Sequence, residues 1–189
     1  MNQSFYGLLL FAGLLVPPVA RLMESIMIVH MHMQMPLLVI SGFLMAHAFQ
    51  TRFPRFFDKW NEGGLPGILL FSIITVYWMI PRTMDEAITM QSMELFKFVS
   101  LPFLAGIPLR DSWKRLGNMG RNVTIGVFTV LFFAAGFIYL NSNEQLCNSY
   151  LLIEQITLGW GFLLTAVAMT IYLLYITFVD REAYEGPAS

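Results

Sequence analysis

The sequence predicts an all-α polytopic membrane protein, a single bundle of about six transmembrane helices that takes up residues 1–189 as one domain. Hydrophobic residues make up 57% of the chain and charged residues only 12%, about half the charged fraction of a typical soluble domain. The apolar residues also gather in six blocks, and a membrane-spanning helix needs about 20 such residues. A β-barrel would instead show alternating segments of about ten residues.

The six predicted helices follow the apolar blocks in chain order. The first is expected to end or kink at Pro17-Pro18, because proline lacks a backbone donor. No basic residue precedes this block, so we expect a retained helix rather than a cleaved signal peptide. The last block is long enough to tilt or to extend past the bilayer. The predicted ranges are Phe5–Arg21, Ser25–Phe49, Leu65–Ile80, Gln91–Leu109, Val123–Leu140 and Tyr150–Val179.

Basic residues concentrate in two of the predicted connections, Gln50–Gly64 and Arg110–Asn122. Because positive charge is retained on the cytoplasmic side, we expect both connections and both termini in the cytoplasm. The connection Asn141–Ser149, with the single cysteine Cys147, then faces outward. We expect a multi-pass protein of the cell (inner) membrane of a bacterium. Its basic loops should contact lipid headgroups, and a net charge of −1 gives no indication of a nucleic-acid partner.

The stretch Met23–Pro36 holds five of the thirteen methionines and two of the three histidines. Thioether and imidazole groups together suit a soft metal ion, above all Cu(I). Residues three, four and seven apart share one face of a helix, so Met27, His30, Met31 and Gln34 lie together and His32 points away. Methionine also fills irregular gaps between helices, so packing without a metal remains the alternative.

Further polar and thioether groups are expected at the same end of the bundle. We predict that His30 binds Cu(I) with Met27 or Met31, helped by Met79 or Met90. Gln34 is expected to hydrogen-bond a ring nitrogen of His30, as groups that orient a metal-binding imidazole do. Asp85 is a further predicted metal ligand, and Glu154 and Gln155 are expected beside the ligands. The alternative for the ionisable groups is ion pairing, of Arg82 with Asp85 or Glu86 and of Lys97 with Glu94.

Four fragments in order resemble the CtaG family, the caa3-type cytochrome c oxidase assembly factors. Trp78-Met79-Ile80-Pro81 with Asp85 and Ala87 is similar to the Trp-His-Leu/Ile-Pro…Asp-Ala-Ala segment of the family. His30 and Gln34 resemble its His-Met-x-Gln-His segment. The other two similar fragments are Glu94 with Phe98 and Gly106, and Glu154-Gln155 with Gly159. The resemblance implies a role in oxidase assembly.

Most of the family's histidines are replaced in this chain. Met79 and Leu95 stand at two histidine positions, and an alignment on Gln34 places Met31 and Met35 at two more. Glu154 stands where the family has aspartate, and family members usually have about seven spans. The resemblance therefore indicates a divergent relative. Replacement of imidazole by thioether favours Cu(I), since thioethers are the softer ligands.

The predicted function is a membrane assembly factor or metallochaperone that handles copper for a copper enzyme, with a haem–copper oxidase subunit as the expected partner. We do not expect an enzyme, because no catalytic triad, phosphate loop or cofactor fingerprint is recognisable. The alternatives are a structural subunit of a membrane complex and a copper or small-solute transporter. A haem redox protein is disfavoured because His30 and His47 are separated by about 25 Å of helix.

Overall fold

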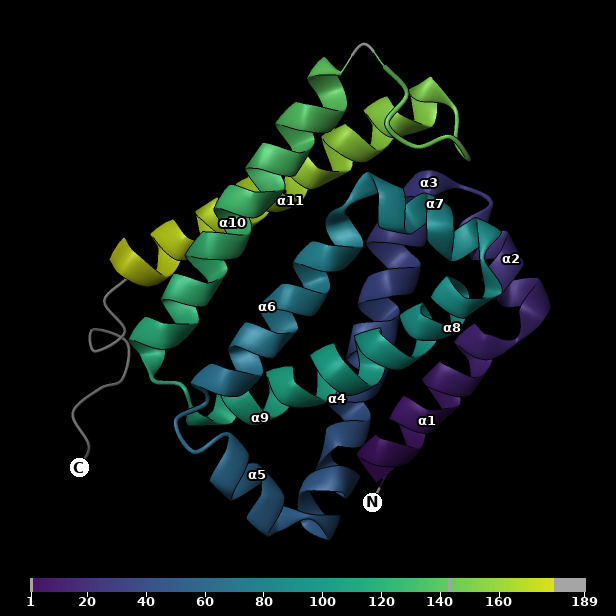
Figure 1. Ribbon diagram of the computed structural model, residues 1–189. Helices are drawn as coiled ribbons and strands as arrows, with labels where there is room; N and C mark the ends of the chain where they lie inside the picture. Colours follow the sequence, from purple (N-terminus) through teal and green to yellow (C-terminus); the bar gives the residue numbers. More distant parts are fainter. Residues whose placement is uncertain (1, 143, 179–189) are drawn as a thin grey trace.

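The computed structural model describes residues 2–142 and 144–178, and Figure 1 shows their helices and connections. No strand occurs in these two ranges, which confirms the all-α fold class. The elements are α1 (Asn2–Leu15), α2 (Pro17–Glu24), α3 (Met27–Val29), η1 (His30–Gln34), α4 (Met35–Arg52), α5 (Pro54–Trp60), α6 (Leu65–Met79), α7 (Pro81–Thr89), α8 (Gln91–Val99), η2 (Ser100–Gly106), α9 (Ile107–Arg115), α10 (Asn118–Asn141) and α11 (Leu152–Phe178), where η marks a π-helix.

Four continuous helical segments of the described chain are long and apolar enough to cross a membrane. They are Met27–Arg52, Gln91–Arg115, Asn118–Asn141 and Leu152–Phe178. Two further candidates are pairs of helices bent at a break, by 72° between α1 and α2 and by 85° between α5 and α6. The chain is thus a membrane protein, with four to six candidate spans among the described residues, and the predicted six requires that each bent pair crosses as one unit. The predicted end at Val179 lies outside the described residues.

Several predicted connections are helical. The short helix α5 lies within the predicted loop Gln50–Gly64, α7 lies between the predicted third and fourth spans, and α9 continues to Arg115. Arg110, predicted to begin a basic loop, is instead a buried residue of α9. Its guanidinium donates to the carbonyl oxygen of Phe43 at 2.9 Å and to Gln3 Oε1 at 2.9 Å. A charged group inside a bundle is stable only with such partners, which the sequence pattern did not reveal.

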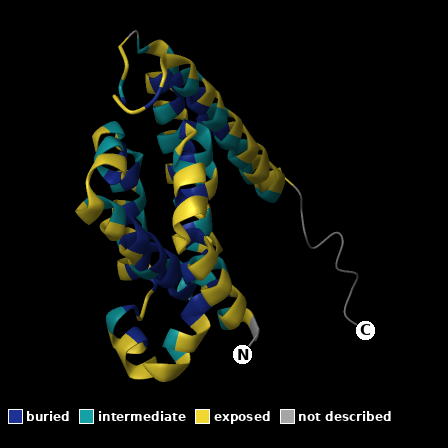
Figure 2. Cartoon of the chain, turned by 90° about the vertical axis from the view of Figure 1, so that its right-hand side faces the viewer, coloured by how far each residue is buried: buried dark blue, intermediate teal, exposed yellow. Residues whose placement is uncertain are grey.

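The helix α4 occupies the centre of the bundle and packs against α1, η2 and α9. Its crossing with η2 brings the two backbones into contact at Gly42, where an added Cβ would lie 1.9 Å from the Pro102 carbonyl oxygen. Small residues at a crossing allow membrane helices to approach this closely. Buried residues lie between the helices and exposed residues on the outer surface (Figure 2).

The helices α10 and α11 form an antiparallel hairpin that leans over the other helices (Figure 1). Gly136 and Gly159 bring the two helices close together, since a Cβ on Gly136 would lie 3.0 Å from the Gly159 carbonyl oxygen. The main backbone contact of the hairpin with the remainder is between α11 and the short helix α3. Attachment is therefore concentrated at the end that carries His30, which we call the His30 end. The opposite end, with α5 and the last turn of α9, is called the Arg115 end.

Both π-helices contain or adjoin a proline. The Met35 N–H bonds the carbonyl oxygen of His30 and the Ile107 N–H that of Pro102, each five residues back. Proline cannot donate to the carbonyl four residues before it and clashes with that carbonyl, so Pro36 and Pro102 favour a locally wider turn. Such turns occur frequently at functional sites, and η1 carries both His30 and Gln34.

Candidate functional site

A cluster of polar side chains is buried at the His30 end, and we call it the Lys97 cluster. Its members come from four separate parts of the chain: Glu24 ends α2, His30 and Gln34 begin and end η1, Lys97 lies in α8, and Tyr150 precedes α11. The side chains of Lys97, His30 and Gln34 have no exposed surface. Ionisable groups within membrane-spanning segments are costly and mark functional sites, so this cluster is the leading candidate.

The ammonium group of Lys97 is surrounded by three acceptors. It forms an ion pair with Glu24 Oε1, donates to Gln34 Oε1 at 3.4 Å, and lies 3.3 Å from His30 Nε2. Gln34 Nε2 also donates to the Glu24 carboxylate at 3.4 Å. Carboxylate, amide and imidazole acceptors that converge on one cation have the composition of a cation-binding site, and the cation here is the protein's own lysine.

The hydrogen bonds of Tyr150 define the tautomer of His30. The Tyr150 hydroxyl donates its one hydrogen to the Glu24 carbonyl oxygen at 2.7 Å, so at 2.9 Å from His30 Nδ1 its oxygen must accept from Nδ1–H. The neutral imidazole then carries its lone pair on Nε2, which faces Lys97. Burial, with added effects of Glu24 and Glu154, raises the pKa of Tyr150, so this hydroxyl keeps its proton at neutral pH.

The predicted helix face is confirmed, whereas two predicted contacts are wrong. Met27, His30, Met31 and Gln34 are all buried, and His32 points instead toward Phe162, with ring centroids 4.8 Å apart. Gln34 bonds Lys97 and Glu24 rather than a ring nitrogen of His30. Lys97 pairs with Glu24 rather than Glu94, while the alternative pairing of Arg82 with Glu86 is confirmed at 2.9 Å.

Three predicted site residues position the connection between α10 and α11. Asp85 accepts from the backbone N–H groups of Asn148 at 2.7 Å and Ser149 at 3.2 Å. Glu154 accepts from the backbone N–H groups of Met27 at 3.3 Å and Leu151 at 3.0 Å. The buried Gln155 accepts from the Leu146 N–H at 2.8 Å. Because Tyr150 lies within this connection, these bonds place its hydroxyl against His30.

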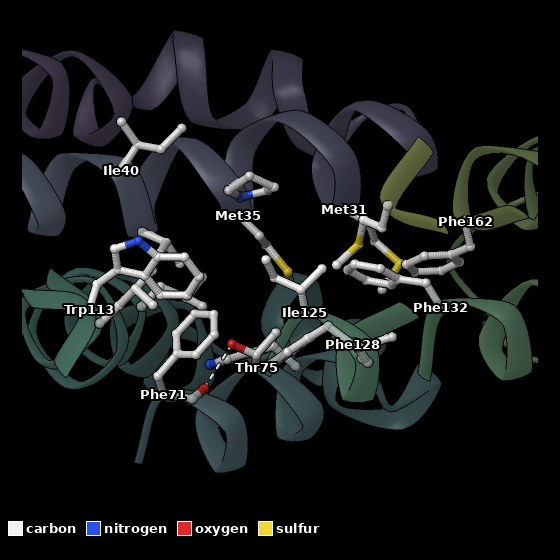
Figure 3. A pocket seen from close by; sticks show the side chains of 17 residues that line it. Met31, Met35, Ile40, Phe71, Thr75, Trp113, Ile125, Phe128, Phe132 and Phe162 are labelled. Carbon is white, nitrogen blue, oxygen red and sulfur yellow. Dashed lines mark hydrogen bonds between the residues drawn. The ribbon is translucent and has the colours of Figure 1, made fainter. Parts of the chain in front are cut away.

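The predicted methionine ligands are divided among different surroundings. Met27 is fully buried, one helical turn before His30. Met31 and Met79 line an apolar cavity together with Met35 and Met169 (Figure 3 labels Met31 and Met35). Met90 separates α7 from α8 and is 52% exposed. Within residues 2–142 and 144–178, no three His, Cys, Asp or Glu side chains gather as a metal site, so any metal here would need thioether or amide donors.

Sequence reasoning missed Glu24 and Tyr150 as members of the cluster. Glu24 is the one acidic residue in the first 50 positions, and an isolated carboxylate in an apolar region requires a partner. The sequence therefore indicated that Glu24 has a buried partner, but it did not indicate which residue that partner is. Tyr150 gave no comparable signal, because a tyrosine near the end of a membrane helix is ordinary.

A second polar cluster, also missed, lies at the Arg115 end. The buried Asn61 donates to Asp111 at 2.7 Å and to Ser112 at 3.1 Å, and accepts from the Gly67 N–H at 2.9 Å. Arg115 pairs with Asp111 at 3.1 Å and with Asp58 at 2.8 Å. These bonds join α5, α6 and α9. They also satisfy polar groups at the turn between α5 and α6, where the chain bends by 85°.

Fold and site together define an all-α membrane protein with a buried lysine-centred cluster at one end of its bundle. A scan against protein-family models finds no match, and searches of curated proteins and of solved structures also find none. The resemblance to the CtaG family therefore stays a prediction, carried by the fragments quoted from the sequence alone.

Proposed function

We propose that this protein binds Cu(I) at the His30 end and passes it to a copper enzyme of the same membrane. The observation that carries the proposal is the state of His30, whose Nε2 lone pair is buried and faces a cation. Metal-binding histidines characteristically donate their other ring N–H to a neighbouring oxygen, as His30 does to Tyr150. A haem–copper oxidase is the proposed partner, on the strength of the CtaG resemblance.

The donors around His30 suit a monovalent soft cation. Met27 is fully buried and Met31 nearly so, and both lie within one turn of His30. Thioether and imidazole ligands select Cu(I). Gln34 and Glu24 already place oxygen atoms around the same point. In this proposal Met79 and Met90 serve later steps of transfer rather than the first capture.

Lys97 acts in the proposal as a resident cation that Cu(I) replaces. At Nε2 itself, one single positive charge takes the place of another. Because a buried carboxylate left without a partner is destabilising by about 3–5 kcal/mol, Lys97 keeps its bond to Glu24 and withdraws from His30 alone. When copper departs to the partner, the ammonium returns. Such exchange favours transfer over storage.

The test is anaerobic Cu(I) loading of the purified protein, with metal content measured after desalting. The variant with His30→Leu and Met31→Leu should lose copper while it still folds, because Tyr150 keeps its bond to the Glu24 carbonyl oxygen and Lys97 its bonds to Glu24 and Gln34. Tyr150→Phe removes the group that orients the imidazole and should weaken copper binding by about 10–100-fold. The double variant Glu24→Gln with Lys97→Met removes the competing cation and leaves no buried charge without a partner. It should bind copper more tightly than the parent.

His32→Leu is the matched control, because His32 lies on the same helical stretch but faces α11. It should keep the parent's copper content. If His32→Leu loses copper and His30→Leu does not, the assignment of the site is wrong. If the parent binds no Cu(I), the proposal fails, and the methionines then serve packing in a structural subunit of a membrane complex.

A further inference from the structure

A cavity of about 380 Å³ lies between the α10–α11 hairpin and the helices α4, α6 and α9 (Figure 3). Its walls are almost entirely apolar, with aromatic rings from both sides: Phe71 of α6 lies 5.2 Å from Phe128 of α10 between ring centroids. Thr75 contributes a hydroxyl, which already donates to the Phe71 carbonyl oxygen at 2.8 Å. Water would find no polar partner in such a space. Any ligand must therefore be apolar in the part that lies inside the cavity.

The cavity is elongated along the helices. On α4 and the preceding η1 its lining residues run from Met31 to Ile40, which is roughly 13 Å of helix. On α10 they run from Ile125 to Phe132, roughly 10 Å of helix. A space that extends in the direction of the helices can take a hydrocarbon chain along its length.

Positive charge lies at the Arg115 end of the cavity. Trp113 lines the cavity there, and Arg121 donates to its carbonyl oxygen at 2.9 Å with the guanidinium 5.9 Å from the indole ring. The neighbouring Lys114 is exposed. Basic pockets between membrane helices bind anionic lipid headgroups, and arginine recognises phosphate oxygens through its planar fork of donors.

We propose that this cavity binds one hydrocarbon chain of an anionic phospholipid, whose phosphate rests against Arg121. The chain fills the space between Phe71, Ile125 and Phe128, and the headgroup stays at the membrane surface beside Trp113. Occupancy joins the hairpin to the other helices where direct backbone contact is sparse. The charged end of this site is the one opposite to the Lys97 cluster, and the proposed copper residues Met31 and Met79 line other parts of its wall.

The test is native mass spectrometry of the full-length protein purified in mild detergent, then exposed to phosphatidylglycerol or phosphatidylcholine. The parent should retain more phosphatidylglycerol than phosphatidylcholine. Ile125→Trp fills the cavity and should lose most of the bound lipid. The Arg121→Gln variant should still bind the hydrocarbon chain of a lipid, but its preference for phosphatidylglycerol over phosphatidylcholine should fall about fivefold. This factor corresponds to about 1 kcal/mol for one basic group near an anionic lipid.

Val130→Trp is the matched control, because Val130 is on the same helix but 67% exposed on its outer surface. It should bind lipid as the parent does. Should Ile125→Trp fail to fold, Val39→Phe fills the cavity from the opposite wall and must show the same loss. Equal retention of the two lipids by the parent would overturn the proposal. So would a bound neutral isoprenoid lipid, or undiminished binding in the cavity-filling variant.

Discussion

At the scale of single residues, burial determined which charges pair. Lys97 and Glu94 are three apart on one helix, a spacing that allows an ion pair, yet Lys97 is fully buried and pairs with Glu24, 73 positions away. The helical period correctly predicted the buried face with Met27 and His30. It could not predict the partners of that face, because Glu24 and Tyr150 come from elements whose position depends on the whole fold.

Cys147 provides a prediction at this scale. Burial, together with the charge of Asp85, raises the pKa of its thiol to about 12. Because the thiolate is the reactive form, Cys147 should react with N-ethylmaleimide at pH 7 roughly a thousandfold more slowly than an exposed cysteine of ordinary pKa. Because the pKa is higher in the folded than in the unfolded protein, folding favours the neutral thiol. The stability that Cys147 contributes is therefore fully present below about pH 8.5, the pKa of an exposed thiol, and is lost as the pH rises toward 12.

The measurement compares labelling rates of the native protein and of the protein unfolded in denaturing detergent. The matched variant, Cys147→Ser with Asn148→Cys, moves the thiol by one position to an exposed side chain and should label rapidly in the native state. Equal rates for the parent and this variant would mean that the connection between α10 and α11 opens freely.

At the scale of helices, the apolar blocks predicted where the spans lie but not where they widen or break. The predicted starts at Gln91 and Leu65 agree with α8 and α6, because apolar content changes sharply there. The π-turns could not be predicted from the period, since they depend on how each proline is accommodated. The break before Pro17 was expected, whereas the helix α5 within a charged loop was not.

The crossing of α4 and η2 gives the second prediction. An added Cβ at Gly42 meets three backbone atoms of Pro102 within 2.6 Å, and backbone cannot rotate away as a side chain would. Gly42→Ala should therefore destabilise the protein by about 1–3 kcal/mol or more, the cost of overpacking a filled interior. Thermal unfolding in detergent measures this difference.

Gly126 is the control for Gly42, because a Cβ at that position meets nothing within 4 Å. Gly126→Ala should leave stability unchanged or raise it by up to about 1 kcal/mol, the intrinsic preference of a helix for alanine. If the two substitutions have the same effect, the close crossing is not a determinant of stability.

At the scale of the whole molecule, the two polar clusters lie at opposite ends of the bundle. The basic residues Arg52, Arg55 and Lys59 lie at the Arg115 end with α5, and Asn148 lies at the His30 end. The sequence was sufficient to predict this separation, since loop charge and helix order determine it. It was not sufficient to predict how the hairpin leans, which depends on contacts between distant side chains.

The orientation can be tested with single cysteines at the two ends. In a Cys147→Ser background, Asn148→Cys should react with a membrane-impermeant maleimide in intact cells, and Glu62→Cys should react after permeabilisation alone. The reason is the retention of positive charge in the cytoplasm. Both positions are exposed, so access to the reagent differs only through the membrane. The reverse pattern would invert the proposed topology and place the copper site inside the cell.

The α10–α11 hairpin is attached to the other helices at its two ends and, between them, where Phe162 of α11 lies against His32. At one end Asp85 and the Tyr150 hydroxyl hold the connection that joins its helices, and at the other the short turn at Leu116-Gly117 joins α10 to α9. Hinge motions are absorbed at the ends of such elements. A sideways displacement of α10 toward the lipid would therefore widen the cavity while the attachments at both ends hold.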